Sequence, residues 1–136
     1  MSLRWSDLNA AALNTPPIAI VSPDPSPDTT RLCALPQHAV LEVAGADAQN
    51  FLQGQLTCDV QALVAGKLGC GAYCSPKGRM LASFLIWRGV SQGESEVFHL
   101  LLPASLAEPI RKRLTMFVLR AKVSIRIVQT PLLGCI

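Results

Sequence analysis

The feature that most constrains the fold is a run of prolines at alternate positions, Pro23, Pro25 and Pro27. A proline fixes φ and lacks a backbone N–H, so this run forms neither a helix nor a central strand. We therefore expect residues 22–30 to be an extended surface loop. Together with a short helix predicted over 2–13, this loop makes residues 1–30 an N-terminal extension. The folded domain is then expected to occupy residues 31–136.

The composition is that of a small globular domain. The sequence has 136 residues, of which 50% are hydrophobic and 15% are charged. This apolar content is enough for a hydrophobic core and excludes a wholly disordered chain. The longest uncharged stretch, residues 8–23, is interrupted by prolines, and no apolar run follows the first residues. We therefore expect neither a membrane span nor a signal peptide, and a cytoplasmic protein.

Charge is unevenly distributed along the chain. Residues 1–68 hold three basic and six acidic residues, whereas residues 69–136 hold nine basic and three acidic ones. The basic half is either a solvated rim or a surface for an anionic ligand, RNA or protein.

The cysteine count is five, and an odd number in a cytosolic chain indicates reduced thiols. Cys70 and Cys74 are the close pair. On a strand their thiols are roughly 13 Å apart, too far to share a zinc ion unless the chain turns between them. We therefore expect no metal site and interpret both residues as small buried hydrophobes.

Hydrophobic periodicity predicts the order β-α-β-β-β-α-β from residue 39 onward, with a further short strand at 32–35. The predicted strands cover residues 39–43, 68–73, 79–88, 96–102 and 122–128, and the predicted helices cover 46–53 and 105–119. Helices that interrupt mainly antiparallel strands indicate an α+β fold, a sheet with two packed helices.

Local signals refine the expected boundaries. Asp47 falls in the first turn of the first helix, where the helix dipole favours an anion, and Gly54 is a natural residue to end it. Ser105 and Glu108 have the spacing of a capping box at the start of the second helix. Residues 75–78, Ser-Pro-Lys-Gly, suit a type I turn between two strands.

The residues alone do not support an enzyme. There is no phosphate-binding loop, dinucleotide fingerprint, zinc-protease motif or nucleophile signature, so no catalytic residue is assigned. The best local candidate is the turn where Lys77 and Arg79 flank Gly78, close to Tyr73. Two cations could hold a carboxylate or phosphate, and the Tyr73 ring could stack on a flat ligand. The alternative is an ordinary polar turn.

Three blocks of sequence resemble the YgfZ-type folate-binding proteins, relatives of the glycine-cleavage aminomethyltransferase (T-protein). The blocks are residues 41–60, 71–82 and 113–123. The first block matches at Asp47, Phe51, Leu52, Gln53, Gly54, Gln55, Thr57 and Asp59. The second block matches at Tyr73, Pro76, Lys77, Gly78 and Arg79.

The resemblance implies the N-terminal part of a three-domain ring around a folate pocket. It implies a folate-binding accessory protein for iron–sulfur enzyme maintenance and tRNA modification. It further implies that tetrahydrofolate contacts Tyr73, Lys77 and Arg79.

Two departures from the family limit what the resemblance implies. Ala82 and Ser83 stand where the aminomethyltransferase branch has an acidic pair, so methylene transfer is not expected. The Cys-bearing signature of later YgfZ sequence is absent. The chain therefore resembles a third to a half of the family protein. We expect weak folate binding by this chain alone, and a homodimer or a partner chain that supplies the missing part.

Two other functions stay open at this point, an aminomethyltransferase-like enzyme and a basic module that binds RNA or protein. Such a module would use a set of basic residues in the second half, with tRNA or an iron–sulfur protein as the partner. The set is Arg111, Lys112, Arg113, Arg120, Lys122 and Arg126. We assign Phe117, the aromatic residue nearest these cations, to the core, which leaves little support for base stacking.

Overall fold

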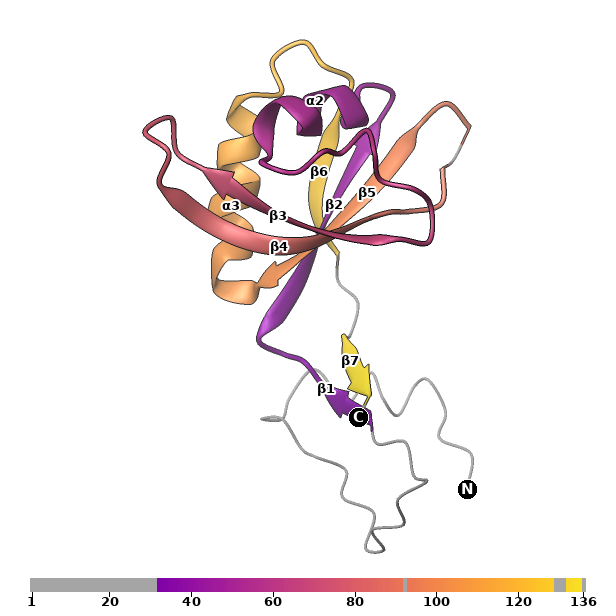
Figure 1. The fold of residues 1–136 in the computed structure, drawn as a ribbon, viewed down its shortest axis with the longest axis vertical. Helices are drawn as coiled ribbons and strands as arrows, with labels where there is room; N and C mark the ends of the chain where they lie inside the picture. Colours follow the sequence, from indigo (N-terminus) through magenta and orange to yellow (C-terminus); the bar gives the residue numbers. More distant parts are fainter. Residues whose placement is uncertain (1–31, 92, 129–131, 136) are drawn as a thin grey trace, which may run out of the picture. The chain divides into compact units, whose positions relative to one another are not determined.

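The computed structural model describes residues 32–91, 93–128 and 132–135 (Figure 1). The predicted helix over 2–13, the proline-rich loop and the boundary after residue 30 lie outside these residues. The chain divides into two compact units. One contains β1 (Leu32–Ala34) and β7 (Leu133–Cys135), which pair antiparallel. The other runs from Ala39 to Val128 and contains all the features discussed below.

Within the described residues, five strands form one sheet in the order β3-β4-β5-β2-β6. The strands are β2 (His38–Gly45), β3 (Leu68–Cys74), β4 (Met80–Arg88), β5 (Glu96–Pro103) and β6 (Ser124–Val128). The helices are α2 (Ala48–Gln55) and α3 (Ala104–Met116). The pairings β3–β4, β4–β5 and β2–β6 are antiparallel. The predicted α+β fold and the order β-α-β-β-β-α-β are confirmed. The short strand predicted at 32–35 is β1, and β7 was not predicted.

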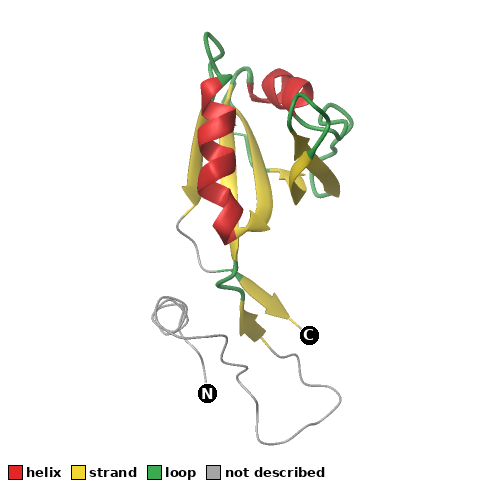
Figure 2. Cartoon of the chain, turned by 90° about the vertical axis from the view of Figure 1, so that its left-hand side faces the viewer, coloured by secondary structure: helices red, strands yellow, loops and turns green. Residues whose placement is uncertain are grey.

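One face of the sheet forms the hydrophobic core. Alternate side chains of β4 and β5 are buried, as expected for strands with one covered face. They pack with Ala48 and Leu52 of α2 and with Ile110 and Leu114 of α3. Figure 2 shows α3 lying along this face. Burial of each large apolar side chain contributes about 1.5–3 kcal/mol. No helix among the described residues is long and apolar enough to cross a bilayer.

The ends of α2 differ from the prediction. The helix continues through Gly54 to Gln55, so Gly54 does not end it. Asp47 is the N-cap residue, but its side chain makes no capping bond. Its carboxylate instead accepts a hydrogen bond from the Lys122 N–H at 2.7 Å. A contact between residues 75 positions apart has replaced the local one.

The ends of α3 also differ. The predicted capping box is wrong, because the N-cap residue is Pro103 and Ser105 lies inside the helix. Glu108 accepts two hydrogen bonds from Arg111, at 2.7 and 2.8 Å, instead of reaching back to the helix start. The helix ends at Met116 and not at residue 119, because Leu119 has a φ of +41° and cannot continue it.

Candidate ligand-binding site

The β3–β4 hairpin has the turn that its sequence predicted. The Gly78 N–H donates to the Ser75 carbonyl at 2.8 Å, and the Ser75 N–H donates to the Arg79 carbonyl at 2.8 Å. The Ser75 hydroxyl accepts from the Arg79 N–H at 3.2 Å. Gly78 has a φ of +78°, a conformation that favours glycine. These bonds fix the backbone on both sides of Lys77.

The three predicted site residues are not equally accessible. Lys77 and Arg79 are exposed, and within the described residues neither forms an ion pair. Tyr73 is only 5% exposed and belongs to the hydrophobic core. Its ring is therefore not presented for stacking at the hairpin surface. A ligand contact by Tyr73 stays a prediction, and the two cations are the surface part of the candidate site.

The positions where the aminomethyltransferase branch has its acidic pair lie within this hairpin, on β4. Ala82 pairs with Tyr73 and is buried, whereas Ser83 is exposed. Successive strand residues point to opposite faces. The two side chains therefore face different environments, and neither supplies a carboxylate.

The polar residues of the first matched block shape the loop after α2. The Gln53 side-chain oxygen accepts hydrogen bonds from the Val60 and Gln61 N–H groups at 2.7 and 3.1 Å. The Asp59 carboxylate accepts from Gln61 and Ala62, and the Thr57 hydroxyl accepts from the Ala72 N–H at 2.9 Å. These side chains have structural roles that sequence spacing did not reveal.

A charged group that the sequence analysis missed lies on the sheet face opposite the core. We call it the sheet-face cluster: Glu42, Trp87, His99 and Arg126. The Arg126 guanidinium donates to the Glu42 carboxylate at 2.7 Å, and His99 Nε2 lies 3.5 Å from the other carboxylate oxygen. Trp87 stacks on His99 with ring centroids 5.3 Å apart. The hydrogen bond from Arg126 lowers the pKa of Glu42, with smaller contributions from its charge and from His99.

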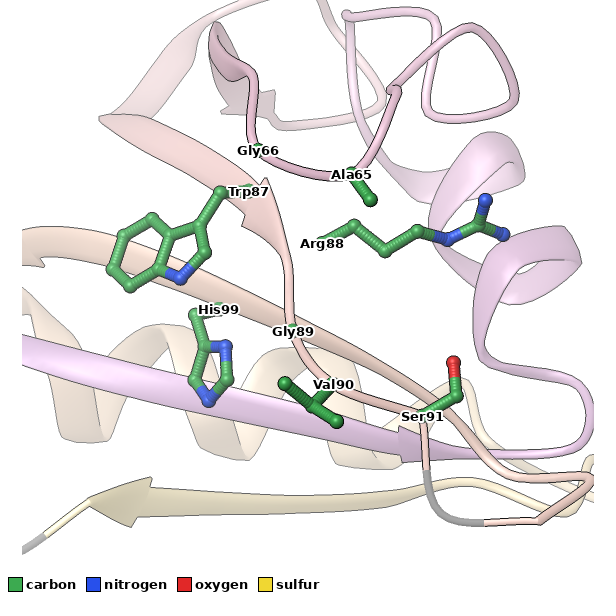
Figure 3. A pocket seen from close by; sticks show the side chains of 8 residues that line it. All are labelled: Ala65, Gly66, Trp87, Arg88, Gly89, Val90, Ser91 and His99. Carbon is green, nitrogen blue, oxygen red and sulfur yellow. The ribbon is translucent and has the colours of Figure 1, made fainter.

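An open pocket adjoins the sheet-face cluster (Figure 3). It is lined by Ala65, Gly66, Trp87, Arg88, Gly89, Val90, Ser91 and His99. In Figure 3 the Arg88 side chain extends away from the Trp87–His99 pair. Its guanidinium bonds to Gln49 and, at 2.6 Å, to Glu96, and it lies over the Phe98 ring. Arg88 therefore has structural partners, and the stacked pair is the planar part of the pocket wall.

The cysteines do not form a metal site in the described residues. Cys58, Cys70 and Cys74 are free thiols there, and no group of three metal-ligating side chains was found. Cys70 is exposed, so its interpretation as a buried hydrophobe is wrong. Burial raises the pKa of the Cys58 thiol, which keeps it in its neutral form.

The six basic residues of the predicted RNA- or protein-binding set fall into two groups. Arg111 pairs with Glu108 and Arg126 pairs with Glu42, while Lys112 lies 3.8 Å from Glu108. The remaining three, Arg113, Arg120 and Lys122, are exposed and form no ion pair with any described residue. Phe117 is 48% exposed, so its assignment to the core is wrong.

The comparisons with known proteins agree on one group of relatives. No family model matches the chain. It is 34% identical over 101 residues to the tRNA-modifying protein YgfZ of Colwellia psychrerythraea. It is 30% identical over 123 residues to the protein of that name from Photobacterium profundum. The matches cover 74% and 90% of this chain but 29% and 36% of those proteins. The chain thus spans about a third of their length.

A solved structure shares the fold. The glycine cleavage system aminomethyltransferase T from Bartonella henselae matches with a TM-score of 0.68 and 18% sequence identity. The match covers 75% of this chain and 27% of that one. At this identity the match establishes the arrangement of strands and helices.

Proposed function

Because this chain is a YgfZ-type relative with the aminomethyltransferase fold, we propose that it is a folate-binding accessory protein that acts in tRNA modification. The observation that carries this proposal is the agreement between the two comparisons. The sequence relatives are named for tRNA modification, and the shared fold is that of the aminomethyltransferase T. The family resemblance extends the proposed role to the maintenance of iron–sulfur enzymes.

The candidate folate site is the β3–β4 hairpin. Folates carry carboxylates at one end and a flat pterin at the other. Lys77 and Arg79 suit the carboxylates, since both are exposed and lack an ion pair within the described residues. The backbone between them is held by the turn bonds of Ser75. The ring of Tyr73 is buried, so the hairpin is proposed to hold the carboxylate end of tetrahydrofolate.

The proposed activity is binding without methylene transfer. On β4, within the hairpin, Ala82 presents a buried methyl group and Ser83 an exposed hydroxyl. Neither can act as the carboxylate that contacts folate in the aminomethyltransferase branch. The sequence therefore supports an accessory role, and no residue of this chain is proposed to be catalytic.

The proposed partners are tRNA, an iron–sulfur protein, and either a second copy of this chain or a separate chain that completes the folate pocket, all in the cytoplasm. Several large apolar side chains are exposed, among them Val64 at 63%, Leu68 at 61% and Met80 at 62%. Leu68 and Met80 lie at opposite ends of the β3–β4 hairpin, so these side chains are separate contact points for a partner and not one patch. Light scattering at micromolar concentration tests the homodimer. A measured mass equal to that of one chain counts against it.

Calorimetric titration with tetrahydrofolate tests the proposed function. We expect weak, saturable binding by the unaltered chain and a loss of about tenfold or more in Lys77→Ala/Arg79→Ala, since each charge-assisted hydrogen bond contributes ~1.5–3 kcal/mol. The matched control is Arg113→Ala/Lys122→Ala, which removes the same charge elsewhere and is expected to bind as before. Absence of binding at millimolar tetrahydrofolate would contradict the proposal.

A further inference from the structure

The end of α3 and the loop between α3 and β6 expose large apolar side chains. Met116 is 65% exposed, Phe117 48% and Leu119 88%. Leu119 also has a φ of +41°, a left-handed conformation that residues with a Cβ rarely adopt. Its side chain gains nothing from packing that would offset this strain. Strained residues of this kind concentrate where a segment is held for binding.

The loop is anchored to the start of α2, and both Figure 1 and Figure 2 show it beyond the end of the sheet. The Lys122 N–H donates to the Asp47 carboxylate at 2.7 Å, and the Asp47 N–H donates to the Lys122 carbonyl at 3.4 Å. A Cβ on Gly45 would lie 1.9 Å from the Lys122 oxygen, so the two backbones are in direct contact. Within the loop, the Ala121 N–H donates to the Val118 carbonyl at 2.8 Å.

Unpaired cations lie close in sequence to these apolar side chains. Arg113 lies three residues before Met116, so both share one side of the last turns of α3. Arg120 and Lys122 belong to the loop, and within the described residues none of the three cations forms an ion pair. We call these six residues the loop patch: Arg113, Met116, Phe117, Leu119, Arg120 and Lys122.

We propose that the loop patch binds RNA, with phosphates held by its three cations and an unpaired base stacked on Phe117. An unpaired RNA strand presents flat, largely apolar bases beside phosphate charges, which matches the mixture of side chains in the patch. The cations are unpaired and exposed, as phosphate contacts require. This inference rests on the proposed role in tRNA modification and assigns the RNA contact to a surface distinct from the β3–β4 hairpin.

Fluorescence anisotropy with a labelled tRNA transcript tests the proposal across ionic strength. We expect the unaltered chain to bind, and its affinity to fall as salt rises. The variant Arg113→Ala/Arg120→Ala/Lys122→Ala should lose a factor of about ten or more in tRNA affinity. The slope of log K against log salt concentration should become shallower by roughly 2 to 3. The Lys122 contact with Asp47 uses the backbone N–H, so the substitution leaves the anchor intact. Circular dichroism checks that the fold is retained.

Two further variants make the outcome decisive. Phe117→Ala should weaken tRNA binding about tenfold with an unchanged salt slope, because stacking is lost and charge is not. Lys77→Ala/Arg79→Ala, the matched control on the hairpin, should leave tRNA affinity within about twofold. The proposal is overturned if the unaltered chain does not bind tRNA, if binding does not depend on salt, or if the hairpin control loses as much affinity as the loop-patch variant.

The same set of proteins separates this inference from the proposed function. Loss of tRNA binding in the loop-patch variant with no tetrahydrofolate binding by any protein contradicts the folate proposal alone. Tetrahydrofolate binding that depends on the hairpin, without tRNA binding, contradicts the loop-patch proposal alone.

Discussion

The sheet-face cluster and the loop patch both combine basic and aromatic side chains, but only the cluster pairs its cation with a carboxylate. In the cluster Glu42 lies between Arg126 and His99, and His99 stacks on Trp87. In the loop patch Arg113 and Arg120 form no ion pair with any described residue, and the apolar side chains face solvent. The difference indicates that the cluster stabilises the sheet, whereas the patch is available to a partner.

The largest expected effect comes from breaking the anchor that holds the loop patch in place. Gly45→Ala places a Cβ 1.9 Å from the Lys122 carbonyl oxygen, at a φ of +147°. We expect the free energy of unfolding to fall by on the order of 3 kcal/mol, measured by urea denaturation.

Gly54→Ala is the matched control for this substitution. Gly54 is helical, and among the described atoms a Cβ there meets nothing within 4 Å. The control should gain about 0.5–1 kcal/mol from its better helix propensity. Equal stability of the two variants would show that the loop is not held at Gly45.

The next largest effect concerns the paired charges. Glu42→Gln removes the negative charge that both Arg126 and His99 approach. Since Arg126 is 70% exposed, we expect a loss of only about 1 kcal/mol in urea denaturation. Arg113→Ala, in the loop patch, should change stability by less than ~0.5 kcal/mol. Similar losses of unfolding free energy in the two variants would contradict the contrast between a paired cluster and an unpaired loop patch.

The lowered pKa of Glu42 predicts a smaller, pH-dependent effect. A carboxyl group whose pKa is lowered in the folded state stabilises the protein at pH values above 4.5, the pKa of the same group in the unfolded chain. That stability is lost as the pH falls from about 4.5 through the lowered folded pKa. The difference in unfolding free energy between the unaltered chain and Glu42→Gln should therefore shrink between pH 6 and pH 3. A difference that is constant over this range would contradict the ion pair.

The smallest effect is expected at the strained residue of the loop patch. Leu119→Gly relieves the left-handed conformation but adds freedom to the unfolded chain. These contributions oppose one another, so the free energy of unfolding should change by less than ~0.5 kcal/mol in urea denaturation. A loss well above 1 kcal/mol would show that the Leu119 side chain has a structural role that its exposure does not indicate.

Sequence patterns predicted what depends on neighbouring residues. The strands at 79–88 and 96–102 and the Ser75 turn were predicted because their causes are local. At the start of α2 a distant partner intervened, since the Asp47 carboxylate accepts from the Lys122 N–H. The predicted capping box of α3 was wrong for a local reason, since Glu108 bonds to Arg111.

In the candidate site, too, features set by local sequence were predictable and features set by distant contacts were not. The exposure of Lys77 and Arg79 follows from the turn, but the burial of Tyr73 depends on which strand face meets the helices. The Trp87–His99 stack requires the β4–β5 register, which places those two residues opposite each other. The exposure of Phe117 follows from the early end of α3.

Nuclear magnetic resonance tests the central claim most directly, with ¹⁵N-labelled protein titrated with 5-formyltetrahydrofolate. We predict chemical-shift changes that saturate and that centre on the amides of residues 73–82. No saturable change, or changes confined to the Trp87–Ser91 pocket or to the loop patch, would contradict a folate site at the β3–β4 hairpin.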